Sequence, residues 1–115
     1  MNNKEKGKLG EDLAAKFLEE KNYEILERNW RYGQFGEIDI IAKDNNTLVF
    51  VEVKTRSTTV CGQPIEAIDA KKFLQIQNIA KAYMLQATKK YKSYRIDAVC
   101  VMLNPQEIKH LKGIS

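Results

Sequence analysis

Hydrophobic and polar positions follow two different periods along this chain. Near the N-terminus apolar residues recur every four positions, among them Leu9 and Leu13, which predicts a helix over residues 4–21. A second stretch with helical spacing covers residues 65–88, and Asp69 within it is a suitable N-cap for the main body of that helix. Residues 4–21 and 65–88 are therefore expected to be helical.

Between and after these helices, apolar residues alternate with polar ones or run continuously, as in β-strands. Asn45-Asn46 and their neighbours are typical of a hairpin turn. The helix before the last clear strand permits a parallel crossover. Strands are predicted over residues 23–32, 37–42, 48–54 and 94–103, and residues 107–114 fit a short strand or a helical turn equally well.

The order helix, three strands, helix, strand predicts an α/β domain with a mixed sheet flanked by helices. A length of 115 residues and 43% hydrophobic content suit a single domain, residues 1–115, with one small core. No apolar run approaches the length of a membrane span, and the N-terminus lacks the apolar core of a signal peptide. The expectation is a cytoplasmic protein with no membrane partner.

Three charged residues interrupt the apolar central strands. Asp39 lies among isoleucines, and Glu52 and Lys54 end the run LVFVEVK on one strand face, roughly 6.5–7 Å apart. Charges on a buried strand are costly unless they are paired or bind a metal. Two carboxylates at the ends of adjacent strands can hold a hard divalent cation, with the lysine facing the water or phosphate beside it.

Charge is divided unevenly along the chain. Residues 1–60 carry 10 positive and 11 negative side chains, whereas residues 61–115 carry 9 positive and 4 negative. Basic residues thus flank an acidic candidate site, which suits a polyanion partner. Many basic proteins bind no nucleic acid, so charge alone leaves this open.

Other residues have two interpretations from the residues alone. Glu11 falls at the edge of the first helix's apolar stripe, where it can face a site or simply be solvated. Arg28 and Arg31 beside Trp30 and Tyr32 can meet a phosphate backbone and a base, or Trp30 can be a core residue with the arginines in water. The same choice between phosphate contact and an ordinary surface role applies to Arg56 and Lys72.

Two further groups carry less weight. Cys61 and Cys100 form no CxxC motif, which favours reduced cysteines and no structural zinc. Nothing in the sequence pairs Cys61 with His110, the one histidine, so a cysteine hydrolase is disfavoured. Asp97 interrupts the apolar run of the last strand, and structural support through Arg95 or a helix is the favoured role.

The acid in the first helix, the aspartate on the second strand and the ExK element on the third resemble the PD-(D/E)xK nuclease superfamily. More closely, the chain resembles the YraN-like family of small bacterial proteins assigned as endonucleases, which are related to archaeal Holliday-junction resolvases. The resemblance covers nearly the whole chain. Its segments are Gly7-x-x-Gly10-Glu11, Asn29-Trp30-Arg31, Gly36-Glu37-Ile38-Asp39, Phe50-Val51-Glu52-Val53-Lys54-Thr55-Arg56, Gly62-x-Pro64, Lys72 and Arg95-x-Asp97.

This resemblance implies a restriction-endonuclease-like fold of order αβββαβ and a role for each matching residue. Asp39 and Glu52 would be metal ligands, and the Val53 carbonyl would complete the coordination of Mg²⁺ or Mn²⁺. Lys54 would orient or activate the attacking water. Glu11 would be the extra acid that such proteins often supply from the first helix. Glu37, two residues before Asp39 on the same strand face, could join the site or pair with an arginine.

The resulting hypothesis is a metal-dependent nuclease that hydrolyses DNA, structured or branched, by in-line attack of a metal-activated water. DNA is favoured over RNA, and a homodimer is left open because two strands of a branched substrate must be cut. One alternative is a non-cleaving nucleic-acid-binding module on the same fold. Another is a structural or partner-binding protein whose acids form salt bridges with Lys54 and Arg56.

Overall fold

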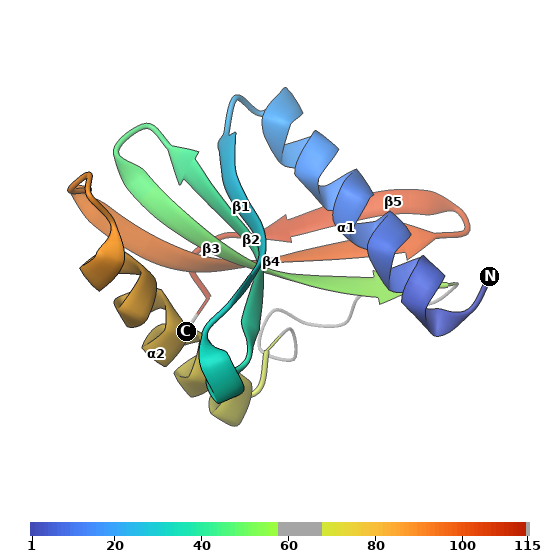
Figure 1. Cartoon of the computed structure of the whole chain (residues 1–115). Coiled ribbons are helices and arrows are strands. Elements are labelled where there is room, and N and C mark those ends of the chain that lie inside the picture. The colour runs from blue at the N-terminus through green and yellow to red at the C-terminus, as the bar shows by residue number, and fades with distance from the viewer. Residues whose placement is uncertain (58–67, 115) are drawn as a thin grey trace.

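A five-stranded mixed sheet forms the centre of the molecule in the computed structural model, which describes residues 1–57 and 68–114 (Figure 1). The predicted α/β class and the order αβββαβ are confirmed, and the undecided C-terminal segment forms a fifth strand. The elements are α1 (Asn3–Glu20), β1 (Glu24–Arg31), the short 3₁₀ turn η1 (Gly33–Phe35), β2 (Glu37–Asp44), β3 (Thr47–Arg56), α2 (Ala70–Gln86), β4 (Ser93–Leu103) and β5 (Gln106–Leu111).

The strands lie in sequence order, from β1 at one edge to β5 at the other. Neighbours are antiparallel except β3 and β4, which pair in parallel from Thr47 opposite Ser93 to Arg56 opposite Met102. The chain reaches β4 through the segment that contains α2, so the parallel crossover that the sequence permitted is present.

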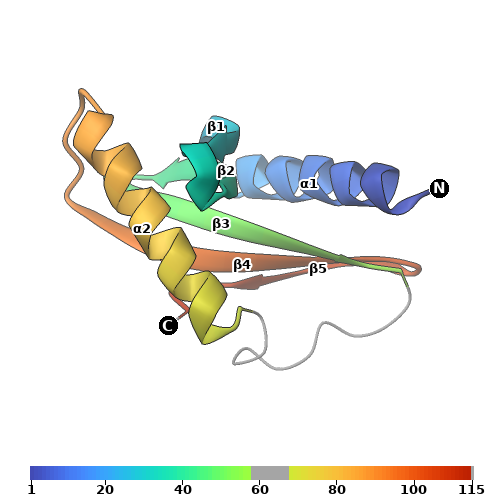
Figure 2. The same cartoon turned by 60° about the horizontal axis from the view of Figure 1, so that its bottom comes forward.

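The two helices cover opposite faces of the sheet, which Figure 2 shows edge-on. Side chains alternate along β3, so Val49 and Val51 pack with α1 while Leu48 and Phe50 pack with α2. This is why the LVFV run is apolar at every position. The alternation breaks on β2 around Asp39, since Ile40 packs with the α1 cluster and Ile38 with the α2 cluster.

Several predicted boundaries were wrong by a few residues. β3 continues through Thr55 and Arg56, which were expected in a loop, because the parallel pairing with β4 extends that far. The hairpin turn is reduced to Asn45 and Asn46, with Asn45 in a left-handed conformation. Asp69 is the N-cap of α2, as the later of the two predicted starts required, and residues 65–67 lie outside the described part of the chain.

The buried stripe of α1 is shifted from the one predicted. Leu9 is 38% exposed, whereas Gly10, Ala14 and Leu18 are buried against the sheet. The smaller residues allow the helix to approach the strands closely, which a stripe centred on leucines would not. An asparagine N-cap begins the helix, where Asn2 and Glu5 form a reciprocal capping box.

Asp97 is the one charged residue that is fully buried among those described. It lies at the centre of a hydrogen-bond network between β4, β5 and the C-terminal segment. Its carboxylate accepts hydrogen bonds from Arg95 (3.0 Å) and from the Gly113 backbone (2.9 Å), and it lies 2.7 Å from the His110 ring nitrogen. Burial alone would raise the pKa of Asp97, but these three partners outweigh burial and lower it. The network ties β5 and the C-terminal segment to β4, so the expected structural role fits.

Two remaining expectations concern membranes and cysteines. None of the described helices is both long and apolar enough to cross a membrane. Cys100 is disulfide-bonded, so the expectation of reduced cysteines was wrong for this residue. Cys61, like Gly62 and Pro64 of the family resemblance, lies outside the described residues.

Candidate functional site

The candidate site begins where the pairing of β2 with β3 ends. The last paired residues are Ile40 and Val51, and beyond them the Asp39 carboxylate accepts a hydrogen bond from the Val53 backbone N–H at 2.8 Å. A side chain thus replaces the next strand-to-strand hydrogen bond. This opens the sheet locally and fixes an acidic group beside Glu52.

Asp39 and Glu52 form a close carboxyl pair. Burial, followed by the hydrogen bond and the charge of Glu52, raises the pKa of Asp39 to about 7, against the opposing hydrogen bond from Val53. The Glu52 carboxylate lies 3.4 Å from the Lys72 ammonium at the start of α2. A pair of carboxyl groups that resists joint ionisation, with a cation beside it, is typical of sites built to hold positive charge.

Glu11 reaches the same region because α1 and β3 approach closely. A Cβ built at Gly10 would overlap the Thr55 hydroxyl, so only glycine allows this packing without a shift. Burial raises the pKa of Glu11, and the charges of Asp39 and Glu37 add to this against an opposing hydrogen bond from Asn29. Glu11 therefore lies near enough to Asp39 for their charges to interact.

Asn29 holds Glu11 in place. Its side-chain amide donates a hydrogen bond to Glu11 Oε1 at 2.9 Å. Asn29 has a φ of 51°, a left-handed conformation that asparagine tolerates better than most residues. In the β1–β2 register it falls between the pairs Arg28–Ile40 and Trp30–Ile38, which puts it opposite Asp39.

These side chains surround an open pocket of about 520 Å³ at the end of the sheet. The pocket lies where β2 begins, near the C-terminal end of β3 and close to the N-terminal ends of both helices. Its lining is predominantly polar and includes both lysines and carboxylates. The lining residues are Asn3, Lys6, Gly7, Glu11, Asp39, Glu52, Val53, Thr55 and Lys72.

The structure brings together most, but not all, of the residues expected to be catalytic. Glu11, Asp39 and Glu52 line one pocket, and Val53 lines it too. Lys54 lies on β3, half-buried, on the same face as Glu52 by strand alternation, but it is not among the residues that line the pocket. Lys72 provides an ammonium group within the pocket instead.

Two of the four expected nucleic-acid-binding residues already form ion pairs with acidic side chains of the protein itself. Arg28 lies 2.8 Å from Asp12 and 3.9 Å from Glu11, and Lys72 is paired with Glu52. The Arg31 side chain is 64% exposed, with Glu37 at 4.0 Å. Arg56 is exposed at the end of β3. Arg31 and Arg56 are therefore the more accessible cations of the four.

The site offers a divalent cation two carboxyl groups as ligands, those of Asp39 and Glu52. Within residues 1–57 and 68–114, no three acidic, histidine or cysteine side chains lie close enough together to hold a metal ion. The carboxyl pair of Asp39 and Glu52 remains, and Mg²⁺ is commonly held by one or two carboxylates with water completing its shell. A cation between the two would also relieve the repulsion that raises the pKa of Asp39.

Sequence reasoning did not anticipate the roles of Asn29 and Lys72. Asn29 was noticed only as part of the Asn29-Trp30-Arg31 segment, and Lys72 only as a phosphate contact. An asparagine within an otherwise regular strand was a usable signal for a left-handed residue. No signal in the sequence indicated the Glu52–Lys72 pair, because that contact depends on how α2 lies across the sheet.

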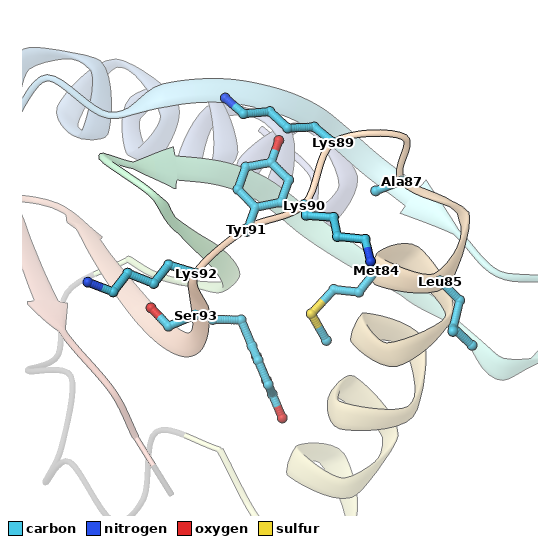
Figure 3. A pocket seen from close by; sticks show the side chains of 9 residues that line it. Met84, Leu85, Ala87, Lys89, Lys90, Tyr91, Lys92 and Ser93 are labelled. Carbon is cyan, nitrogen blue, oxygen red and sulfur yellow. The ribbon is translucent and has the colours of Figure 1, made fainter.

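A second pocket, of about 450 Å³, lies at the other end of the sheet (Figure 3). Lys89, Lys90 and Lys92 line it together with Tyr91 and Tyr94, and no acidic residue is among its lining residues. The Lys89 ammonium lies 5.5 Å from the centre of the Tyr91 ring. These lysines form a basic turn between α2 and β4, which is a cationic surface with an apolar floor.

Comparison with known proteins places the chain among small proteins of similar length. A model of the uncharacterised protein family UPF0102 matches residues 10–101. The chain belongs to the UPF0102 family. This family is commonly called YraN-like, so the family part of the predicted resemblance is confirmed.

UPF0102 proteins from several bacteria align over most of their length with this chain. The one from Persephonella marina is 47% identical over 94% of this chain and 90% of its own length. Those of Dictyoglomus turgidum and Syntrophus aciditrophicus are 43% and 49% identical, over 92% and 87% of this chain and 89% and 78% of their own lengths. The UPF0102 match includes Glu11, Asp39, Glu52 and Lys54.

Proposed function

We propose that this UPF0102 protein is a divalent-metal-dependent nuclease that hydrolyses phosphodiester bonds, with DNA as its substrate. The carboxyl pair of Asp39 and Glu52, in an open pocket with a lysine, is the observation that supports this most. The sheet order and the two flanking helices suit the restriction-endonuclease-like fold that the resemblance implies. Mg²⁺ or Mn²⁺ is the cofactor, because both prefer oxygen ligands.

In this proposal Asp39 and Glu52 hold the cation, and Val53 fixes the Asp39 carboxylate by its backbone hydrogen bond. The cation would polarise the phosphate and lower the pKa of a water molecule. Lys72 neutralises Glu52 and, once a cation takes over that task, is free to contact the phosphate. Lys54 and Glu11 stay candidates for orienting the water and for a further acidic contact.

The charge around the pocket limits how a polyanion can approach. Lys6 and Lys72 line the pocket itself, and Arg56 is exposed at the end of β3 beside it. These cations offset the repulsion that three carboxylates would exert on a phosphate. They do not distinguish DNA from RNA, and we favour DNA because of the resemblance to junction resolvases alone.

A cleavage assay tests the proposal. Labelled single-stranded, duplex and four-way-junction DNA are incubated with the protein, with Mg²⁺, with Mn²⁺ or with a chelator. We expect cleavage that needs a divalent ion and that is lost in Asp39→Ala and Glu52→Gln, while Glu20→Gln, which alters an exposed acid at the far end of α1, cleaves like the wild type. Activity in Asp39→Ala or Lys54→Ala equal to wild type would remove the corresponding residue from the mechanism.

A second function, a DNA-binding module that does not cut, is favoured by one observation. In the described part of the chain each site acid already has a protein partner: Glu11 with Asn29, Glu52 with Lys72, and Asp39 with the Val53 backbone. DNA binding without cleavage in any metal, unchanged in Glu52→Ala, would establish this alternative.

A further inference from the structure

Three aromatic rings form a continuous stack that runs from the core to the surface. Trp30 and Tyr32 are parallel, with 6.2 Å between ring centres and 4° between planes, and Tyr32 and Phe35 follow at 5.4 Å and 20°. The inner ring, Trp30, packs edge-on against Tyr83 of the α2 cluster. The outer rings are open to solvent: Tyr32 is 44% and Phe35 60% exposed.

The sequence left Trp30 as either a base-contacting residue or a core residue. Its contact with Tyr83 makes it the core end of the stack. The exposed end is Phe35, a residue of η1 that carried no prediction of its own. Large aromatic side chains are costly to expose, and an exposed ring braced from behind by another ring is suited to stacking with a flat ligand.

The backbone beneath Phe35 is braced as well. The Tyr32 N–H donates to the Gly36 carbonyl at 2.9 Å, and the Phe35 N–H donates to the Tyr32 carbonyl at 3.0 Å. The Gln75 side-chain amide on α2 donates to the Phe35 carbonyl, so α2 holds the turn from the side. Gly36 has a φ of 117°, and a Cβ there would overlap the Gln75 amide. The ring is thus presented by a turn with little freedom, which lowers the entropic cost of binding.

The stack adjoins the acidic pocket. Phe35 precedes Asp39 by four residues, which limits their backbone separation to about 13 Å. The turn lies beside α2 in both views (Figures 1 and 2), and α2 also supplies Lys72 to the pocket. The exposed Arg31 follows Trp30 on the edge strand β1, so this edge of the sheet also carries an accessible cation. A strand with one phosphate at the pocket can therefore place a base a few nucleotides away on the rings.

We propose that the face of Phe35, backed by Tyr32, stacks with an unpaired base of the nucleic acid held at the acidic pocket. The inference rests on the proposed function and narrows its substrate to nucleic acid with a single-stranded or unpaired position close to the cleaved bond. Bases inside a continuous duplex are already stacked on each other, whereas an unpaired base can stack on an aromatic side chain in a sequence-tolerant way. The parallel arrangement of the rings suits a flat base better than it suits an irregular apolar partner.

The test uses oligonucleotides with the fluorescent base 2-aminopurine at an unpaired position, with Ca²⁺ in place of Mg²⁺. We expect wild-type protein to quench the fluorescence and Phe35→Ala to abolish the quenching. Base stacking on an aromatic residue is worth about 1–3 kcal/mol, so affinity for this DNA should fall roughly tenfold in Phe35→Ala, with affinity for blunt duplex unchanged. Phe35→Trp should retain quenching, and Leu74→Ala, which removes a 58%-exposed apolar side chain of α2 outside both pockets, should behave like the wild type.

Equal quenching and affinity in Phe35→Ala and wild type would overturn the inference. It would also be overturned if Phe35→Ala converted a dimer into a monomer in sedimentation, since a second copy of the chain would then cover the rings. If Phe35→Ala has no effect but Asp39→Ala still loses metal-dependent cleavage, the proposed function stands without the inference. Quenching without any cleavage supports the stacking surface and the non-cleaving alternative, and absence of binding to every DNA overturns both proposals.

Discussion

The Asp39 carboxylate accepts a hydrogen bond from the Val53 backbone N–H, 2.8 Å away, just past the point where β2 and β3 stop pairing. This contact ties a buried acid to the strand that carries Glu52. It holds two carboxyl groups near each other at the mouth of an open pocket, although burial and mutual repulsion oppose their joint ionisation. Such an arrangement lowers the free energy of unfolding of the protein, which is common at functional sites.

Replacing Asp39 with asparagine should stabilise the protein at alkaline pH. An unfolded aspartate titrates near 3.9, whereas Asp39 in the fold titrates at about 7, so the folded state binds more protons between these values and wild-type stability declines as pH rises from about 4 to 7. Asp39→Asn lacks this decline and keeps an oxygen for the Val53 hydrogen bond. We expect a gain of about 2–4 kcal/mol at pH 8 that shrinks towards pH 5. Urea unfolding at both values measures it, and a variant less stable than wild type at pH 8 would contradict the assignment.

The two glycines of α1 form a matched pair for testing the approach of α1 to β3. Gly10→Ala places a methyl group against Thr55 and should cost about 1–3 kcal/mol from overpacking. A Cβ at Gly7 would meet no atom within 4 Å, so Gly7→Ala should be neutral or stabilise by about 0.5–1 kcal/mol through helix propensity. Urea unfolding compares them. Equal effects of the two substitutions would show that the close approach does not exist.

Asp97 should make the fold sensitive to strong acid. Its pKa is lowered in the folded state, so its contribution to stability is present above pH 4 and is lost as pH falls through its folded pKa. Asp97→Asn removes the buried carboxylate beside Arg95, which keeps Asp44 at 3.2 Å, and should cost about 1–3 kcal/mol at pH 7. The loss should shrink below pH 4, where the wild-type carboxyl is protonated too. A difference that stays constant from pH 7 to pH 3 would contradict the network.

The basic turn should contribute to DNA binding through charge alone. Replacing Lys89, Lys90 and Lys92 with glutamine should weaken binding at low salt and reduce the slope of log affinity against log salt by up to about 3, since each phosphate contact contributes roughly 0.9. Lys109→Gln and Lys112→Gln together are the control, because these lysines lie in and after β5. An unchanged slope in the triple variant would place the DNA elsewhere.

The sequence alone predicted the fold class and most elements because each has a strong period of its own. Local preferences are clear in the α1 and α2 patterns, in the LVFV run and in the Asn45-Asn46 turn, and the tertiary structure keeps all of them. The errors arose where contacts with another element determine how long a strand is or which face of a helix is buried. β3 extends to Arg56 because β4 is there to pair with, and the buried face of α1 is centred on Gly10 and Ala14 because close packing favours small residues.

The candidate site was predicted as a set of residues but not as an arrangement. Charges on apolar strands identified Asp39 and Glu52, and the family resemblance added Glu11. Neither indicated that Lys72 would pair with Glu52 or that Asn29 would hold Glu11, because both contacts join segments far apart in sequence. The aromatic stack was missed for a different reason: its residues are close in sequence, but whether Phe35 lies on Tyr32 depends on the shape of the turn η1, which the sequence pattern did not define.

The most direct test of the account is the rate at which the protein cleaves DNA with an unpaired position, measured under single-turnover conditions at increasing Mn²⁺. We predict a rate that rises to saturation with Mn²⁺ in the wild type and in the control Glu20→Gln. Asp39→Asn should be slower by about a hundredfold or more, although it is at least as stable as the wild type. Equal rates in Asp39→Asn and wild type, or cleavage that persists in a chelator, would contradict a metal-dependent site at Asp39 and Glu52.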